Sequence, residues 1–152
     1  MLRLSLPRPI DTQRFAHCLA TTLRGNETIA LSGPLGAGKT CLVRHLCLAL
    51  GVTDNVSSPS YALLHEYSAP DFPVHHFDLY RLQSEEEVWE LGLREVFGQG
   101  LVLIEWPELA RDMLPTGSFH LHLDYHDSGR ELRLNGPVDW LARLEAAWRE
   151  LP

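Results

Sequence analysis

Two short stretches of the chain are continuously apolar, and each of them predicts a buried strand. They are Thr28-Ile29-Ala30-Leu31 and Leu101-Val102-Leu103-Ile104, and their β-branched residues suit strands that are covered on both faces. Segments that mix or alternate apolar and polar residues predict further strands at residues 1–7, 61–67, 74–78, 119–124 and 131–134. A short polar turn joins the last two segments, which should therefore form a hairpin.

Apolar residues at helical spacing predict the longer helices. One helix should stop at Gly51 and bury a stripe made of Leu42, Leu46, Ala49 and Leu50. A helix near the N-terminus should begin at a cap formed by Asp11 or Thr12 and end near Leu23. The last helix should start at Pro137 and bury a stripe made of Trp140, Leu144, Ala147, Trp148 and Leu151.

A shorter helix is indicated by the S-x-x-E spacing of a capping box at residues 84–87, and it should run through Leu91. Strands thus alternate with helices, and we find no linker, repeat or low-complexity tract between them. This order predicts one α/β domain over residues 1–152, with a mixed β-sheet flanked by helices.

Residues 33–40 read Gly-Pro-Leu-Gly-Ala-Gly-Lys-Thr, which fits the phosphate-binding pattern G-x-x-x-x-G-K-[ST]. The predicted strand 28–31 lies just before this segment, and the predicted helix 42–50 lies just after it. Strand, glycine-rich loop and helix are the context that such a P-loop requires, so the sequence predicts a P-loop NTPase-like domain. The loop residues expected to bind ATP are Gly33, Leu35, Gly36, Ala37, Gly38, Lys39 and Thr40.

The residue types of this loop suit a nucleoside triphosphate. Backbone N–H groups of Gly36, Ala37 and Gly38, together with the N-terminus of the following helix, can surround a phosphate group. Lys39 can reach the β- and γ-phosphates, and the hydroxyl of Thr40 can bind Mg²⁺. We therefore expect ATP and Mg²⁺ as the ligands.

Two carboxylates end predicted strands and are candidates to complete the site. Asp78 ends the strand 74–78, and Glu105 follows the strand 101–104. Open α/β sheets bind ligands beyond the carboxyl ends of their strands. We assign Glu105 to Mg²⁺ and Asp78 to the attacking water or to the surroundings of the metal, and the two roles could be exchanged. Ser60, in the polar loop 52–60, offers a hydroxyl that could sense the γ-phosphate.

Composition restricts the partners of the protein. Its 152 residues carry a formal net charge of −7, which argues against a broad nucleic-acid surface, because phosphate backbones are bound by clustered Lys and Arg. No apolar run approaches the ~20 residues of a membrane span, and no signal-peptide core is found. We therefore expect a cytoplasmic protein that has no membrane partner.

Cysteines and histidines add one open alternative. The three cysteines show no C-x-x-C spacing, which predicts reduced thiols rather than disulfides. His120, His122 and His126 lie on or just beyond one predicted strand. They could bind zinc, or they could simply be exposed strand residues.

Motifs beyond the P-loop resemble those of one known family. They are Ser58-Pro59-Ser60-Tyr61, His76-Phe77-Asp78-Leu79-Tyr80-Arg81, Glu90-Leu91-Gly92-Leu93, Ile104-Glu105-Trp106-Pro107-Glu108 and Gly129-Arg130. Their order after the P-loop makes the chain similar to the TsaE family, also called YjeE. These are small bacterial P-loop ATPases required for threonylcarbamoyladenosine (t6A) modification of tRNA. The resemblance covers nearly the whole chain.

The resemblance implies a slow, Mg²⁺-dependent ATPase that supports a complex of TsaB and TsaD. That complex transfers the threonylcarbamoyl group, so tRNA would be a partner only indirectly. The family pattern places Mg²⁺ on Thr40 and Glu105. It implies further nucleotide contacts at Thr12, Glu108 and Arg130.

Three positions of the site depart from the family pattern. Pro34 replaces the usual Asp, Cys41 stands where Thr is common, and Ser60 replaces Thr while keeping the hydroxyl. Because Lys39 and Thr40 remain, ATP binding should survive these changes.

Two other functions are compatible with a P-loop. The first is a small-molecule kinase, against which we find no arginine-rich lid segment. The second is an adaptor that binds ATP without hydrolysing it. Hydrolysis would also need a catalytic arginine, which Arg44, Arg81 or a residue of a partner could supply.

Overall fold

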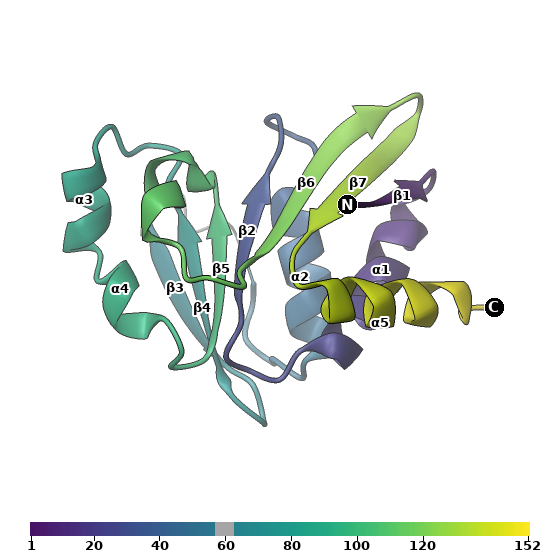
Figure 1. The fold of residues 1–152 in the computed structure, drawn as a ribbon, viewed down its shortest axis with the longest axis horizontal. Coiled ribbons are helices and arrows are strands. Elements are labelled where there is room, and N and C mark those ends of the chain that lie inside the picture. The colour runs from purple at the N-terminus through teal and green to yellow at the C-terminus, as the bar shows by residue number, and fades with distance from the viewer. Residues whose placement is uncertain (57–62) are drawn as a thin grey trace.

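The structure is a computed structural model that describes residues 1–56 and 63–152, whose strands form one mixed sheet (Figure 1). Their order across the sheet is β1-β7-β6-β2-β5-β4-β3. The parallel strands are the four neighbours β6 (Phe119–His126), β2 (Thr28–Ser32), β5 (Leu101–Glu105) and β4 (Pro73–Asp78). Antiparallel strands complete the two sides, namely β7 (Gly129–Asn135) with β1 (Leu2–Leu6), and β3 (Leu64–Ser68). The predicted mixed α/β sheet is confirmed.

The two continuously apolar segments occupy the middle of the sheet. Every residue of β5 is buried, and so are the first four residues of β2. In the parallel register, Glu105 pairs with Leu31 on one side and with Asp78 on the other. The two strand ends that carry Asp78 and Glu105 therefore lie next to each other, beside the strand that leads into the P-loop.

Helices pack on both faces of the sheet. The helices α1 (Pro9–Thr22), α2 (Lys39–Ala49) and α5 (Val138–Arg149) share one apolar core with the strands. On the other face, a smaller core lies over β4 and β5 beneath α3 (Glu85–Glu90), α4 (Leu93–Val96) and the 3₁₀ helix η1 (Pro107–Met113). Figure 1 shows α3 and α4 at the end of the sheet that is far from β1 and α1.

The C-terminal helix buries the stripe that the sequence predicted. Trp140 stacks on Phe119 of β6 with ring centroids 3.7 Å apart, and its Nε1 donates to Thr22 Oγ1 over 3.0 Å. Leu144 is also fully buried, and the rest of the stripe packs at the margin of the same core. This helix therefore ties β6 to α1.

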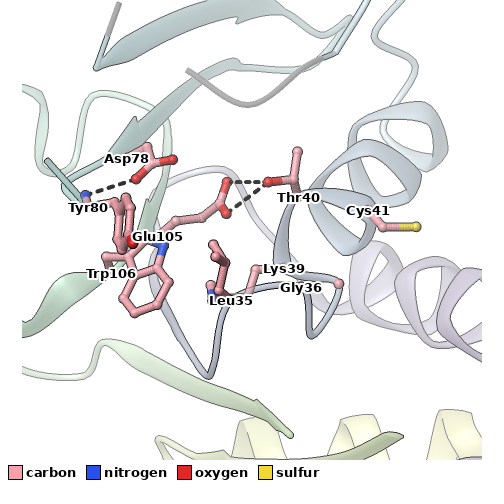
Figure 2. Close-up of a pocket in the computed structure, with 10 residues that line it drawn as sticks. Leu35, Gly36, Lys39, Thr40, Cys41, Asp78, Tyr80, Glu105 and Trp106 are labelled. Carbon is pink, nitrogen blue, oxygen red and sulfur yellow. Dashed lines mark hydrogen bonds between the residues drawn. The ribbon is translucent and has the colours of Figure 1, made fainter. Parts of the chain in front are cut away.

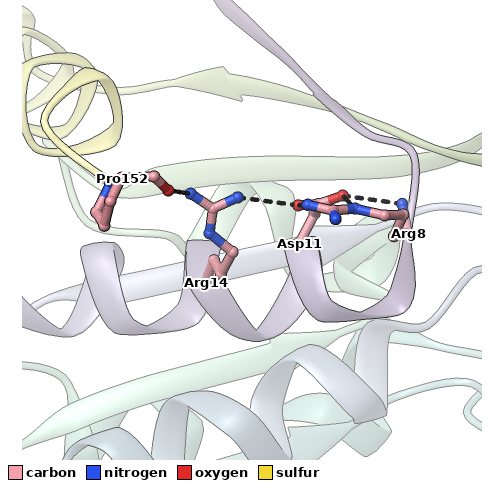
Figure 3. A network of polar contacts seen from close by, with 4 residues as sticks. All are labelled: Arg8, Asp11, Arg14 and Pro152. Carbon is pink, nitrogen blue, oxygen red and sulfur yellow. Dashed lines mark hydrogen bonds and ion pairs between the residues drawn. The ribbon is translucent and has the colours of Figure 1, made fainter.

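The first helix begins earlier than its sequence suggested. Neither Asp11 nor Thr12 is the cap: α1 starts at Pro9, and Arg8 is the residue before it. The Asp11 carboxylate accepts hydrogen bonds from the backbone N and the guanidinium of Arg8, while Arg14 joins Asp11 to the carbonyl of Pro152 (Figure 3). The prediction failed because a carboxylate three residues inside a helix can satisfy its first N–H groups as well as one at the cap.

One other boundary and one capping box differ from the predictions. The described part of β3 starts at Leu64, after Leu63, which has a positive φ of 66°; Ser60 and Tyr61 lie outside the described residues. Ser84 does cap α3, but Glu87 accepts from the N–H of Gln83 and not from that of Ser84, so the capping box is incomplete.

No helix in residues 1–56 and 63–152 combines the length and the apolar character needed to cross a membrane.

Candidate functional site

A cavity of about 220 Å³ opens where β2, β4 and β5 end (Figure 2). The P-loop and the first residues of α2 form one wall of this phosphate cavity, as we name it here. Asp78, Tyr80, Glu105 and Trp106 form the opposite wall. Figure 2 shows the carboxylate of Glu105 pointing across the cavity toward Thr40. The parallel register therefore brings together the loop and both candidate carboxylates.

Glycine is required at three positions of the loop. Gly33, Gly36 and Gly38 have φ values of 137°, 78° and 106°, which residues with a side chain rarely adopt. At Gly33, a Cβ atom would lie 2.1 Å from the carbonyl oxygen of Leu123 in β6. The amide of Ala37 donates to Pro34 O over 3.2 Å, so in this conformation it is used within the loop.

Lys39 is the only lysine in the chain, and it is folded back onto the loop. Its Nζ donates to the carbonyl oxygens of Gly33 and Pro34 over 2.5 and 3.1 Å, and it lies 4.0 Å from the centre of the Trp106 ring. Burial lowers the pKa of Lys39, and the negative charges of Glu105, Glu108 and Asp78 partly oppose this shift. The ammonium is thus held by dipoles and a ring face where a phosphate could replace them.

Thr40 and Glu105 are in direct contact. Thr40 Oγ1 lies 3.0 Å from Glu105 Oε1 and 3.2 Å from Oε2, and Glu105 is only 2% exposed. A hydroxyl and a carboxylate are the oxygen ligands that Mg²⁺ prefers. The two residues assigned to the metal are therefore adjacent.

His76 is a site residue that sequence reasoning named only as part of a family motif and gave no role. Its Nε2 lies 2.6 Å from Glu105 Oε2, and the residue has no exposed surface. A signal was available, because His76 precedes Asp78 by two positions and so shares its face of β4. That signal becomes specific only once Glu105 is known to lie on the neighbouring strand.

Asp78 is 4% exposed, and its Oδ1 accepts a hydrogen bond from Tyr80 N over 2.9 Å. The ring of Tyr80 packs on that of Trp106, with centroids 4.7 Å apart. Trp106 itself has a positive φ of 57°, which turns the chain sharply after β5 and sets the ring beside Lys39. Asp78 is therefore held at the wall of the cavity together with two aromatic rings.

A second cavity of about 340 Å³ adjoins the phosphate cavity, because Gly38 and Cys41 line both. Thr12, Ala37 and Arg130 contribute to this side cavity, as we name it here. Arg130 also supports the loop from outside, since its Nε donates to Ala37 O over 2.8 Å. The predicted residues Thr12 and Arg130 are thus next to the P-loop, although both are far from it in sequence.

Tyr125, on the β6–β7 hairpin, braces the same loop. Its hydroxyl donates to Leu35 O over 2.8 Å, and the guanidinium carbon of Arg130 lies 4.6 Å from the centre of its ring. The hydrogen bonds of Tyr125 and Arg130 to the loop could not be expected from the sequence, because the hairpin lies about 90 residues beyond the loop.

Some predicted residues are not brought into either cavity. Glu108 is exposed on η1 and lines neither cavity, although its charge acts on Lys39. Ser60 lies outside the described residues. Within residues 1–56 and 63–152, no three His, Cys, Asp or Glu side chains are grouped to hold a metal ion, so the zinc alternative is not supported. Instead, Nδ1 of His122 lies 2.8 Å from the hydroxyl of Ser32.

Comparisons with known proteins agree on one family. Residues 6–132 match the family described as threonylcarbamoyl adenosine biosynthesis protein TsaE. The tRNA threonylcarbamoyladenosine biosynthesis protein TsaE of Rickettsia bellii is 40% identical over 126 residues, which cover 80% of this chain and 85% of that protein. The protein of the same name from Haemophilus influenzae is 40% identical over 135 residues, or 85% of each chain.

A solved structure has the same fold. The crystal structure of YdiB from Bacillus subtilis superposes with a TM-score of 0.76 and is 26% identical in sequence. The match covers 97% of this chain and 94% of YdiB.

Proposed function

The chain belongs to the TsaE family of threonylcarbamoyl adenosine biosynthesis proteins, and from this we propose that it is a slow, Mg²⁺-dependent ATPase acting in t6A modification of tRNA. In this role it supports a complex of TsaB and TsaD, through which it meets tRNA only indirectly. The observation that carries the proposal is the contact of Thr40 with Glu105 at the mouth of the P-loop, beside Lys39.

The residues present fit a magnesium ion. Thr40 and Glu105 would hold it, and the phosphate oxygens and water would supply its other ligands, as is usual for Mg²⁺ on a nucleotide. Few protein ligands are needed for this, which is why no larger group of metal-binding side chains is required. When bound, the ion neutralises negative charge on the phosphates.

The P-loop supports binding of the phosphates. Lys39 exchanges its contacts with the carbonyls of Gly33 and Pro34 for phosphate oxygens, which gives a full charge pair in a buried place. The start of α2 lies at the same point, and its N-terminal dipole favours an anion.

The side cavity supports binding of the nucleoside. It is continuous with the phosphate cavity at Gly38 and Cys41, it is largely apolar, and Arg130 lies at its wall. A guanidinium can stack on a base or pair with a phosphate. Thr12 offers a hydroxyl for a polar group of the same ligand.

Asp78 is assigned to the attacking water. Its carboxylate is buried beside Glu105, on the neighbouring strand, and accepts a hydrogen bond from the N–H of Tyr80. Asp78→Asn should keep ATP binding and slow hydrolysis, because the amide preserves the shape but is a poor proton acceptor. A loss of ATP affinity with normal turnover of the ATP that still binds would contradict this role.

The residues that line the phosphate cavity support the proposal that turnover is slow. None of the described residues that line it is an arginine, and Lys39 is its only cation. The Nε of Arg44 donates to Val56 O over 3.1 Å, and the candidates for charge stabilisation are still Arg44, Arg81 or a residue of a partner. The partner complex should therefore change the rate.

The test is release of phosphate from ATP and Mg²⁺, measured with and without purified TsaB and TsaD. We expect slow release by the chain alone and a changed rate with the partners. Release without any acceptor excludes an obligate kinase. Loss of release in Glu105→Ala, with nucleotide binding retained, excludes an adaptor that does not hydrolyse ATP. Release that is indifferent to the partners would contradict the proposed role in their complex.

A further inference from the structure

His76 lies fully inside the protein, where it contacts the carboxylate of Glu105. The oxygens of a carboxylate accept hydrogen bonds and do not donate, so Nε2 of His76 carries a hydrogen and donates it to Oε2 over 2.6 Å. The contact runs diagonally across two strands, because His76 pairs with Leu103 and Asp78 pairs with Glu105. Both residues project from the same face of the sheet, toward α2.

Two donors from different elements therefore hold Glu105. Thr40 approaches from α2 and is closer to Oε1, at 3.0 Å, while His76 approaches from β4 and binds Oε2. A carboxylate with one donor can still rotate about its terminal bond, whereas two donors on different sides define its plane. Oε1 is the oxygen that His76 does not occupy, and it lies on the side of Thr40.

A role in packing alone does not explain the histidine. At this position the ring buries two nitrogen atoms, and burial of a polar atom is costly unless a partner compensates it. The only hydrogen bond of the ring to a residue in 1–56 or 63–152 is the one to Glu105, since Nδ1 has no partner among them. The Tyr67 ring, 6.3 Å away between centroids, packs against it from β3.

We infer that His76 is a positioning residue, which orients the Glu105 carboxylate for the magnesium ion. The inference rests on the proposed function. Partners that hold metal ligands in place typically change metal affinity or activity by about 10- to 100-fold when they are removed. The donor on Nε2 should therefore affect the Mg²⁺ requirement of the protein more than its affinity for the nucleotide.

Two amide substitutions separate the position of the donor from the polarity of the side chain. The amide nitrogen of Gln can take the place of Nε2, whereas the shorter Asn reaches only the place of Nδ1. Mg²⁺ is titrated into the full-length protein saturated with ADP, by calorimetry and by Mn²⁺ competition in electron paramagnetic resonance. In His76→Asn, half-saturation should need about 10- to 100-fold more Mg²⁺. In His76→Gln, it should stay within about threefold of the unchanged protein.

Controls distinguish this inference from the function on which it rests. ADP affinity in EDTA should be the same in both variants, because the P-loop contacts are unchanged. His75→Gln is the matched control, since His75 is also buried in β4 but lies on the opposite face, beside Glu66. Circular dichroism confirms that each variant is folded.

Two results would overturn the role of His76. In one, both variants at position 76 reach half-saturation at the Mg²⁺ concentration of the unchanged protein. In the other, both variants need the same higher Mg²⁺ concentration, so that the position of the donor does not matter. If the unchanged protein binds no ADP even with Mg²⁺, the proposed function fails instead.

Discussion

At the scale of single residues, the surroundings of Lys39 in the P-loop suit a lysine rather than an arginine. The chain uses arginine for all of its other strong bases, so a single lysine among 13 cationic residues stands in the P-loop. A lysine ammonium is a compact point charge, whereas the arginine guanidinium is a wide planar fork. The space between the carbonyl oxygens of Gly33 and Pro34 and the ring of Trp106 suits the compact group.

Lys39→Ala and Lys39→Arg should both weaken ATP binding. Alanine removes the cation, and a hydrogen bond to a charged group contributes about 1.5–3 kcal/mol, which corresponds to about 10- to 100-fold in affinity. Arginine keeps the charge but does not fit, so a loss of at least about tenfold is expected. Titration calorimetry measures both, with Arg143→Ala on α5 as a control. Unchanged affinity in Lys39→Ala would exclude the P-loop assignment.

The three cysteines should differ in reactivity, with Cys41 modified first. Cys47 is fully buried and its pKa is raised to about 12, and burial also raises the pKa of Cys18, so little thiolate forms at pH 8. Cys41 is half-buried and lines both cavities. Iodoacetamide followed by peptide mass spectrometry should show Cys41 labelled alone and protected by ADP with Mg²⁺. Equal labelling of Cys47, or no protection, would disagree with this site.

At the scale of elements, the P-loop is held between the structures on either side of it. The backbone of Leu123 in β6 packs closely against Gly33. The side chains of Arg130 and Tyr125 donate hydrogen bonds to the carbonyl oxygens of Ala37 and Leu35. The loop itself has few regular hydrogen bonds, so its shape depends on this hairpin. The chain continues on the other side into α2, which packs against α1 within the larger core.

The start of α1 should depend on Asp11. Asp11→Asn removes a carboxylate that, from within the first turn, binds the backbone and side chain of Arg8. Loss of side-chain hydrogen bonding at a helix N-terminus costs about 0.5–2 kcal/mol. The hydrogen bond from Arg8 lowers the pKa of Asp11, so its contribution is present above the unfolded pKa of about 3.9 and is lost as the pH falls through the lower folded value.

Urea denaturation at several pH values checks this. The difference in free energy of unfolding should be largest near pH 7 and should shrink below about pH 4. Asp139→Asn is the matched control, because Asp139 is an exposed acid in the first turn of α5. A difference that grows toward acid pH would show that the sign of the pKa shift is wrong.

At the scale of the whole molecule, the parallel register decides where the site forms. Glu105 and Asp78 end adjacent strands, and Glu105 pairs with Leu31 near the end of β2, so the loop after β2 faces the carboxylates of β5 and β4. The helices over the two faces bury separate cores, which leaves this edge of the sheet free to form cavities. A ligand bound there would contact α2, which packs in the larger core, and the residues at the ends of β4 and β5, whose other face carries the smaller core.

ADP with Mg²⁺ should therefore stabilise the whole fold against heat. Ligand at 100 times its dissociation constant adds about 2.7 kcal/mol. For a chain of this size each kcal/mol raises Tm by roughly 2–4 °C, which gives about 5–11 °C in all. Thermal unfolding followed by circular dichroism, with EDTA added as a comparison, measures the shift. A shift of the same size in Lys39→Ala would mean that the ligand binds elsewhere.

The sequence alone determined those features of the protein that depend on residues close together in the chain. The pattern of apolar positions predicted the central strands, α2 and α5. The loop residues predicted a phosphate site, because the glycines, Lys39 and Thr40 lie within one segment. Predictions of where an element begins failed where two possible starting points are nearly equal in energy. The start of α1 is an example, since a carboxylate can stabilise a helix from the cap or from within the first turn.

Only the tertiary structure decided which distant side chains meet. His76 and Glu105 are 29 positions apart, and Arg130 lies 93 positions beyond the loop residue that it binds. Such pairs arise from strand order and register, which are set by burial over the whole sheet rather than by any short pattern. The sequence therefore predicted which residues would bind the phosphates and the metal, whereas the fold decided which side chains hold those residues in place.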